Sequence, residues 1–129
     1  MNVEAFLLCD AATDSAGKLN ILGAFDTINS PNFPTMHPQC YIVVRLRLQR
    51  IESGSHQVTI HIIDDDGKFV VPALDGNFTV EIPASDRSGN VNIILNLQGL
   101  KFDHAGEYAV ILAIDGKEAA RLPLHLKQM

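Results

Sequence analysis

Residues 95–118 read LNLQGLKFDHAGEYAVILAIDGKE, and this stretch decides the fold. Apolar residues dominate 107–115, after a corner that contains Gly106, and the dipeptide Asp115-Gly116 follows them. An Asp-Gly pair between two apolar runs is the strongest short hairpin signal, because a type I′ turn needs positive φ at both central residues. The stretch therefore predicts a strand, a tight corner, a second strand over 107–115 and a hairpin into a third strand.

Alternation of apolar and polar residues continues outward from this stretch. In residues 41–50, YIVVRLRLQR, Leu46 and Leu48 alternate with Arg45 and Arg47. Such a period is typical of a strand with one face in water. Similar or weaker strand patterns occupy residues 4–9, 18–28, 57–64, 68–71, 78–82, 90–97 and 118–126. No segment keeps a helical period, so the chain is predicted to form roughly nine short strands.

Turn signals separate these strands. Residues 64–68, DDDGK, predict a turn at Asp66-Gly67 rather than a helix-loop-helix calcium loop, in which Asp residues stand at alternate positions. The same dipeptide recurs at Asp75-Gly76, and Pro123 suggests an edge position for its strand. Residues 29–38 hold three prolines and predict a crossover between sheets. We therefore predict an all-β, two-sheet antiparallel Greek-key sandwich of about 8–9 strands, as one domain over residues 1–129.

The corner before Tyr108 resembles the tyrosine corner of immunoglobulin-like sandwiches. Asp103, Gly106 and Tyr108 carry this likeness. The resemblance implies that the phenol hydroxyl bonds back to the backbone across the corner while the ring enters the core. Val110 stands where antibody-type domains have cysteine, and the chain has no Trp, so the likeness concerns architecture alone.

The chain also resembles an uncharacterised family of small bacterial single-domain proteins, which is classed as a domain of unknown function. The segments that carry the likeness span nearly the full length: FLLCDAA (6–12), GKLNILGAFDTI (17–28), FPTMHP (33–38), VVRL (43–46), DDDGK (64–68), LNLQGLKF (95–102), GEYAVILAIDGK (106–117) and LPLHL (122–126). The resemblance implies a β-sandwich and a bacterial origin. It implies no activity, substrate or catalytic residue.

Composition narrows the classes of partner. The net charge is −5, which gives no general attraction to nucleic acid or anionic lipid. No apolar run approaches the roughly 20 residues of a membrane helix, and the first residues lack the basic start of a secretory signal. We therefore expect a cytoplasmic protein. The two cysteines, Cys9 and Cys40, are too few for a disulfide scaffold and are expected to be buried, reduced thiols.

No catalytic motif is present in the sequence. There is no Gly-x-Ser-x-Gly elbow, no CxxC and no pair of histidines at a metal-ligand spacing. We therefore predict that the protein is not an enzyme and uses no cofactor. One alternative stays open, namely a loop-based ligand or cation site whose candidate ligands are Asp64, Asp65, Asp66 and Asp103.

One observation points to a binding surface. The strand over 107–115 is apolar on both faces, and Ile94 interrupts an Asn-rich outer face. If Ile94, Ala109, Ile111 and Ala113 lie on one sheet, they form an exposed apolar patch of the kind that marks interfaces, and a homodimer would bury it. The alternative is that a loop such as 29–38 covers it. We predict a non-enzymatic protein-interaction or structural module that self-associates or binds a protein partner.

Overall fold

A computed structural model describes all residues, 1–129, and shows two β-sheets, one short 3-10 helix (Arg50–Glu52) and no α-helix. The strands are β1 (Asn2–Ser15), β2 (Lys18–Phe25), β3 (Thr27–Ser30), β4 (Thr35–Gln49), β5 (Gly54–Ile63), β6 (Leu74–Val80), β7 (Ser88–Phe102), β8 (Gly106–Ile114) and β9 (Lys117–Gln128). The predicted all-β sandwich is confirmed. None of the helices present could cross a lipid bilayer.

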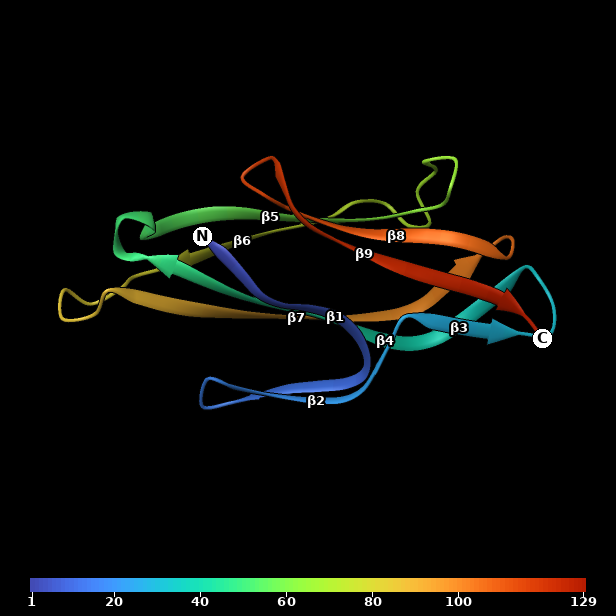
Figure 1. Cartoon of the computed structure of the whole chain (residues 1–129), viewed down its shortest axis with the longest axis horizontal. Coiled ribbons are helices and arrows are strands. Elements are labelled where there is room, and N and C mark those ends of the chain that lie inside the picture. Colours follow the sequence, from blue (N-terminus) through green and yellow to red (C-terminus); the bar gives the residue numbers. More distant parts are fainter.

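The two sheets face each other as layers (Figure 1). Sheet A has the order β2-β1-β4-β7, and sheet B has the order β3-β9-β8-β5-β6. This division of β1, β4 and β7 from β5, β8 and β9 matches strands A, B, E and C, F, G of an immunoglobulin-like sandwich. One pairing departs from the antiparallel expectation, because β3 runs parallel to β9. β3 reaches the edge of sheet B by a crossover after β2 and not by a hairpin, so its direction is not reversed relative to β9.

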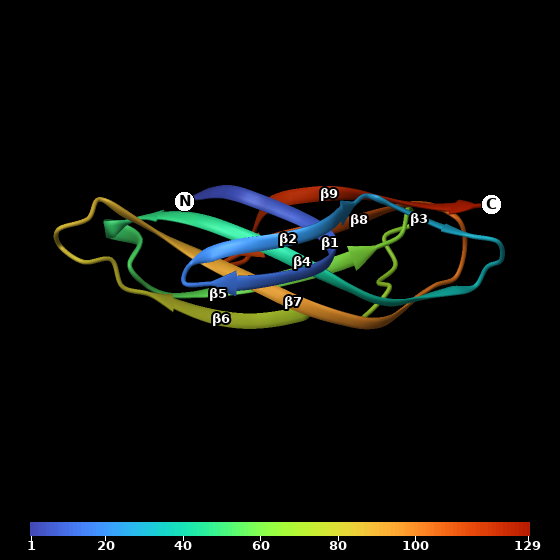
Figure 2. The ribbon, with the colours of Figure 1, turned by 90° about the horizontal axis from the view of Figure 1, so that it is seen from below.

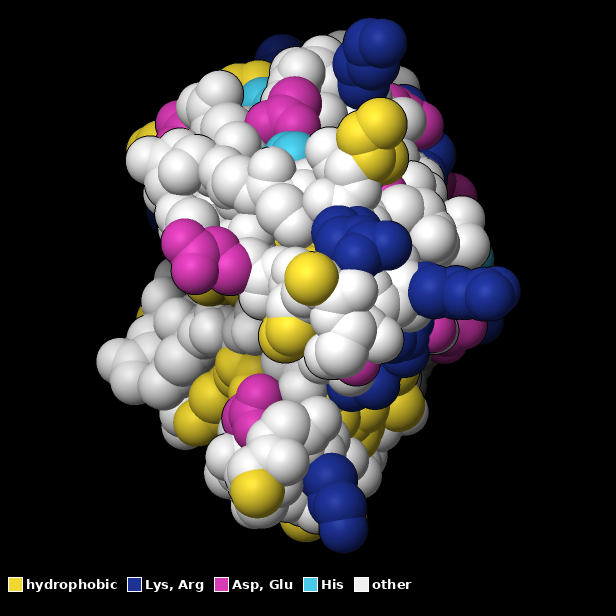
Figure 3. Space-filling view, turned by 90° about the vertical axis from the view of Figure 1, so that its left-hand side faces the viewer, with side chains coloured by type: hydrophobic (Ala, Val, Ile, Leu, Met, Phe, Trp, Pro, Cys, Tyr) yellow, Lys and Arg dark blue, Asp and Glu magenta, His cyan; other side chains and the backbone are white.

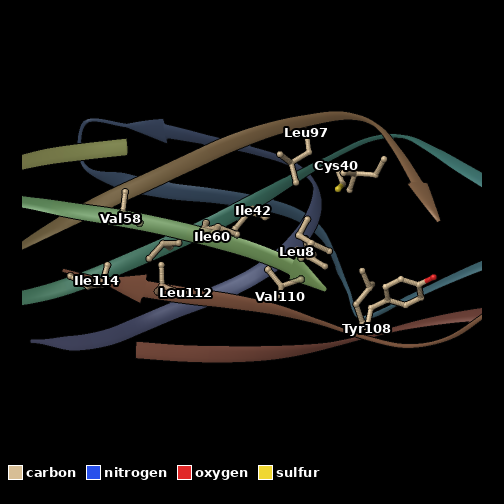
Figure 4. Packing of buried hydrophobic residues seen from close by; sticks show 14 of the residues in the cluster. Leu8, Cys40, Ile42, Val58, Ile60, Leu97, Tyr108, Val110, Leu112 and Ile114 are labelled. Atoms are coloured by element: carbon tan, nitrogen blue, oxygen red, sulfur yellow. The ribbon is translucent and has the colours of Figure 1, made fainter. Parts of the chain in front are cut away.

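Alternating side chains of both sheets fill the space between the layers. Leu46 and Leu48 of β4 and Val110 and Leu112 of β8 are each 0% exposed. Figure 4 shows such side chains from the two sheets pointing toward one another, with Tyr108 at one end of the cluster. The residues that alternation assigned to the inner face of these strands therefore do form the core.

One strand prediction and one turn prediction are wrong. Residues 68–71 form no strand, and only Phe69 is bridged, to Ile63, because the preceding turn ends the regular pairing of β5. Asp75-Gly76 is not a turn but lies inside β6, opposite Thr59 and Val58. The Thr59 hydroxyl donates to the Asp75 carboxylate at 2.8 Å, so sheet pairing outweighs the turn preference of the dipeptide here.

The predicted crossover, with narrower bounds, and the Asp115-Gly116 hairpin turn are confirmed, whereas the Asp66-Gly67 turn differs from the predicted hairpin. β3 ends in sheet B and β4 begins in sheet A, so residues 31–34 carry the chain across. Asp115 and Gly116 have φ of 52° and 81°, as a type I′ turn requires. At the 64–68 turn, only Gly67 has positive φ, at 79°, and its N–H donates to the Asp64 carbonyl at 3.0 Å. That turn is therefore not of type I′.

The hairpin of β1 and β2 folds over the outer face of sheet A. Residues 10–25, here called the hairpin flap, lie across β4 and β7 (Figure 2). Asn92 of β7 donates through Nδ2 to the Asp14 carboxylate and to the Gly17 carbonyl, both at 3.1 Å. Arg45 of β4 also donates to the Gly17 carbonyl, at 3.4 Å. The flap gives sheet A a local third layer that the sequence did not predict.

Candidate functional site

Three of the four predicted interface residues lie on the outer face of sheet B. Ala109, Ile111 and Ala113 project from β8 onto this face, where they are half-buried. Ile111 stands between His61 of β5 and Arg121 of β9. Figure 1 shows no further layer over this sheet, apart from the loop between β5 and β6 at one end.

The same face has an apolar row beside Ile111. Ile63 and Pro123 flank Ala109 on its two sides, and the exposed ring of Phe69 lies against His61 with ring centroids 5.1 Å apart. Phe69 is 57% exposed. We call this set, with Ile111 at its middle, the sheet B face.

A histidine–carboxylate contact and an ion pair border the sheet B face. Glu107 and His125 approach to 2.6 Å between Oε2 and Nδ1 at one end. Glu118 and Arg121 approach to 2.9 Å between Oε1 and Nη2 at the other. Each end of the face therefore holds one acidic and one basic group around an apolar middle, an arrangement of the kind seen in protein interfaces.

Ile94 lies elsewhere. It projects from β7 on the outer face of sheet A, where it packs with Cys9 and Val43 beside the hairpin flap. β7 and β8 belong to different sheets because the corner after β7 carries the chain across the sandwich. Ile94 therefore does not share one sheet with Ala109, Ile111 and Ala113, and the four residues form no common patch. The hairpin flap covers Ile94, whereas the alternative prediction was that a loop such as 29–38 would do so.

The tyrosine corner is confirmed. Tyr108 is 5% exposed, and its hydroxyl donates to the His104 carbonyl at 2.7 Å. Its ring meets Phe102 edge-on, with centroids 5.1 Å apart. The acceptor is the residue four positions before the tyrosine, whereas Asp103 takes no part in this bond.

The corner and the 64–68 turn meet at the end of the sandwich. Asp64 accepts through Oδ1 from the N–H of Asp66 at 2.9 Å and of Lys68 at 2.8 Å. The Lys68 amide is the main reason that the pKa of Asp64 lies below its ordinary value. The second oxygen of Asp64 lies 3.5 Å from Nε2 of His104.

These contacts bring three potential ligands together. One ligand atom each from Asp64, Asp65 and His104 lies within 4.8 Å of the others. Asp66 and Asp103, which were also predicted candidates, do not join them. His104 was missed as a ligand, although its place in the corner beside Tyr108 was a usable signal. Its Nδ1 lies 3.0 Å from the Ala105 carbonyl, which together with Asp64 raises its pKa.

The two thiols are buried on opposite faces of sheet A. Cys9 packs under the hairpin flap, and Cys40 lies in the core between the sheets; they are 0% and 1% exposed. Burial raises the pKa of Cys40 to about 11, so this thiol stays protonated and is a poor nucleophile. Both cysteines are free thiols.

Basic side chains do not gather into an open surface at the end of the sandwich that holds the hairpin tips. Figure 3 shows Lys and Arg interspersed there with acidic and apolar side chains. Arg45 and Arg47 both donate to Glu4, at 3.0 and 3.1 Å. These two arginines are thus already paired with a carboxylate.

Comparisons with known proteins give a family and a fold. The sequence pattern of a family of unknown function, DUF6941, matches residues 4–127. No curated protein matches the chain. Among solved structures, the fold is similar to part of the Pseudomonas fluorescens alkylpurine DNA glycosylase AlkC bound to DNA containing an abasic site analog, with a TM-score of 0.50 and 9% identity. The match covers 98% of this chain but only 30% of that protein.

Proposed function

Because the chain belongs to DUF6941, a family of unknown function, we propose from its geometry that it is a non-enzymatic β-sandwich module that self-associates. In this proposal residues 1–129 act as one domain, and the working surface is the sheet B face. The observation that carries the proposal is the contrast between the two outer faces. The hairpin flap covers sheet A, whereas Ile111 and its neighbours on sheet B have no such cover.

A second copy is the occupant that the sheet B face fits best. Rotation about a two-fold axis that crosses β8 at Ile111 lays one end of the face over the other end in the partner. Ile111 of one copy then lies against Ile111 of the partner subunit, so the contact is isologous and buries the apolar middle of the face.

The reactive groups of the chain support a non-enzymatic role. Cys40 is protonated and buried. One carboxylate oxygen of Asp64 already accepts two hydrogen bonds from backbone N–H groups of its own turn. His56 bonds through both ring nitrogens to Asp115 and to the Glu52 carbonyl. The displaced pKa values of these three groups are thus explained by burial or by hydrogen bonds within the fold.

The remaining parts of the proposal concern partners and place. Net charge of −5 and the pairing of Arg45 and Arg47 with Glu4 support a role without nucleic acid, in spite of the fold shared with a domain of a DNA glycosylase. A cytoplasmic location is the remaining part of the proposal. We place cation binding second, since it rests only on the convergence of Asp64, Asp65 and His104.

Light scattering coupled to size-exclusion chromatography tests the proposal. The purified chain is expected to have a mass above that of a monomer, and Ile111→Asp is expected to lower it while leaving the circular dichroism spectrum unchanged. Thr79→Asp, at an exposed position of β6 outside the sheet B face, is the matched control and is expected to leave the mass unchanged. A monomer at every soluble concentration contradicts the proposal.

A further inference from the structure

β7 leaves a long, open edge on sheet A. It pairs with β4 from Phe102 to Ser88, and no strand lies on its other side. Between Ser88 and Leu100 it contains neither a charged residue nor a proline. Natural sheets blunt such edges with charges, prolines or short strands, because unpaired N–H and C=O groups otherwise pair with another chain.

The other edges of the sandwich carry these protections. The free part of β9 contains Arg121 and Pro123, and β3 is a short strand that covers its last residues. β6 is short and contains Asp75, and β2 begins with Lys18. β7 is thus the one long edge strand that has neither a charged residue nor a proline between Ser88 and Leu100.

The sequence of β7 is nearly symmetric about Ile94. Residues 89–99 read GNVNIILNLQG, and each residue on one side of Ile94 has a counterpart of the same kind on the other. The matched positions are Ile93 with Leu95, Asn92 with Asn96, Val91 with Leu97, Asn90 with Gln98 and Gly89 with Gly99. An antiparallel pair of identical strands centred on one residue joins these same positions across its two-fold axis.

Symmetric pairing in this register also matches the faces of the sheet. Asn90, Asn92, Ile94, Asn96 and Gln98 all project outward, so each would meet an outward residue of the partner. The register matters because a shift of one residue would move every side chain of a strand to the opposite face of the sheet. Here the near-palindrome keeps polar groups opposite polar groups.

The amide side chains have bonding capacity left for this contact. Asn96 accepts from Gln39 through Oδ1 at 3.1 Å, and its Nδ2 has no partner within the chain. Asn92 accepts one bond through Oδ1, from Arg45 at 3.1 Å, and a carbonyl oxygen can accept a second. Asn96 can therefore donate to Asn92 of the partner subunit on each side of the axis.

The inward side of β7 is incompletely covered. Val91, Ile93 and Leu95 point between the sheets but are only half-buried, at the side of the sandwich that the edge strands β6 and β7 form (Figure 2). Gly76 of β6 contributes no side chain to cover this side. A strand added along β7 would bring a second set of these apolar side chains over the opening and remove more of their surface from water.

We propose that β7 pairs antiparallel with β7 of a second copy, in the register centred on Ile94, so that two copies of sheet A become one continuous sheet. This contact is distinct from the sheet B face and shares only the premise of self-association with the proposed function. Its two-fold axis stands normal to sheet A, whereas the axis at Ile111 lies within a sheet face. The two contacts can therefore operate in one assembly.

Substitutions that introduce charges near the two ends of the paired segment of β7 test the proposal by light scattering. Asn90→Lys with Gln98→Lys places lysines opposite lysines, and this variant is expected to halve the mass of the assembly. Asn90→Glu with Gln98→Lys places opposite charges together and is expected to restore the mass. Asn77→Lys, on the exposed edge strand β6, is the control and is expected to change nothing.

Disulfide trapping tests the register itself. Ile94→Cys places two thiols at the axis within the distance that a disulfide spans, so oxidation is expected to give a covalent dimer. Gln98→Cys is the control, because its two copies would be about 27 Å apart and are not expected to cross-link. The cross-linking experiment also tests the β7 contact if the double lysine variant fails to fold.

The outcomes separate the two contacts. An assembly that keeps its mass in the double lysine variant and gives no Ile94→Cys cross-link overturns the β7 contact, even if Ile111→Asp dissociates it. A mass lowered only by the β7 substitutions overturns the sheet B face and supports the β7 contact. Loss of both surfaces is expected to give a monomer, and a wild-type monomer overturns both proposals.

Discussion

His56 and Asp115 lie 2.6 Å apart, from Nδ1 to Oδ2, and their bond ties the β8–β9 turn to β5. The other ring nitrogen of His56 lies 2.6 Å from the Glu52 carbonyl, which belongs to the short helix after β4. Both nitrogens thus face acceptors, which requires a proton on each. Asp115 also accepts from the Gln57 N–H at 2.9 Å. One imidazolium therefore joins three segments at this end of the sandwich.

This pair predicts a pH dependence of stability. The Asp115 carboxylate, and then the Glu52 carbonyl, raise the pKa of His56 above its unfolded value of about 6.5. The stabilisation is therefore complete below that pH and is lost as the pH rises through the folded-state pKa. Urea unfolding at a series of pH values should show this decline, and both His56→Gln and Asp115→Asn should flatten it. An unchanged slope in both variants would refute the assignment.

The tyrosine corner predicts a modest and specific cost. Tyr108→Phe keeps the buried ring and removes only the hydroxyl that donates to the His104 carbonyl. We expect the free energy of unfolding to fall by about 1 kcal/mol, the usual net contribution of such a bond. Tyr41→Phe is the control, since the Tyr41 hydroxyl makes only an exposed contact with Gln39. Equal effects in the two variants would mean that the corner bond contributes nothing special.

Much of the fold was open to prediction because alternation reports directly on burial. Leu46 and Leu48 alternate with Arg45 and Arg47, which predicts that the two leucines share the inner face, and both are fully buried. The Asp115-Gly116 turn was equally readable, since its positive φ values restrict the residues that fit. Alternation, which reflects burial from solvent, and the Asp-Gly turn signal, which reflects steric limits on φ, therefore predicted local structure correctly at these positions.

Features that depend on distant contacts were not predictable. Residues 18–28 divide between two sheets, because the chain leaves sheet A after β2 and joins β9 as β3. The flap over Ile94 depends on bonds between Asn92 and the β1–β2 turn, which are far apart in the sequence. The approach of His104 to Asp64 likewise follows from how two loops meet. Contacts between segments that are far apart in the sequence leave no local pattern from which they could be predicted.

The loop corner distinguishes a structural role from cation binding. Asp64 already caps its turn through Oδ1, so Asp64→Ala is expected to lower the unfolding midpoint in the presence of a chelator as much as in its absence. Calcium or zinc is expected to leave the wild-type midpoint unchanged. A metal-dependent rise that Asp64→Ala and His104→Ala both abolish would instead establish the cation site of Asp64, Asp65 and His104.

The hairpin flap predicts different costs at two glycines that share a left-handed backbone. Gly23 has φ of 71° and Gly17 has φ of 81°, so alanine is strained at both positions. A Cβ at Gly17 meets nothing within 4 Å, whereas a Cβ at Gly23 would come within 2.9 Å of Cγ of Asp10. Gly23→Ala should therefore destabilise the fold by about 0.5–1 kcal/mol more than Gly17→Ala, as measured by chemical denaturation, because the exposed Asp10 side chain must leave its rotamer. Adding Asp10→Ala should recover most of that difference. If the two glycine variants lose equal stability, the close contact between Asp10 and Gly23 does not constrain the flap.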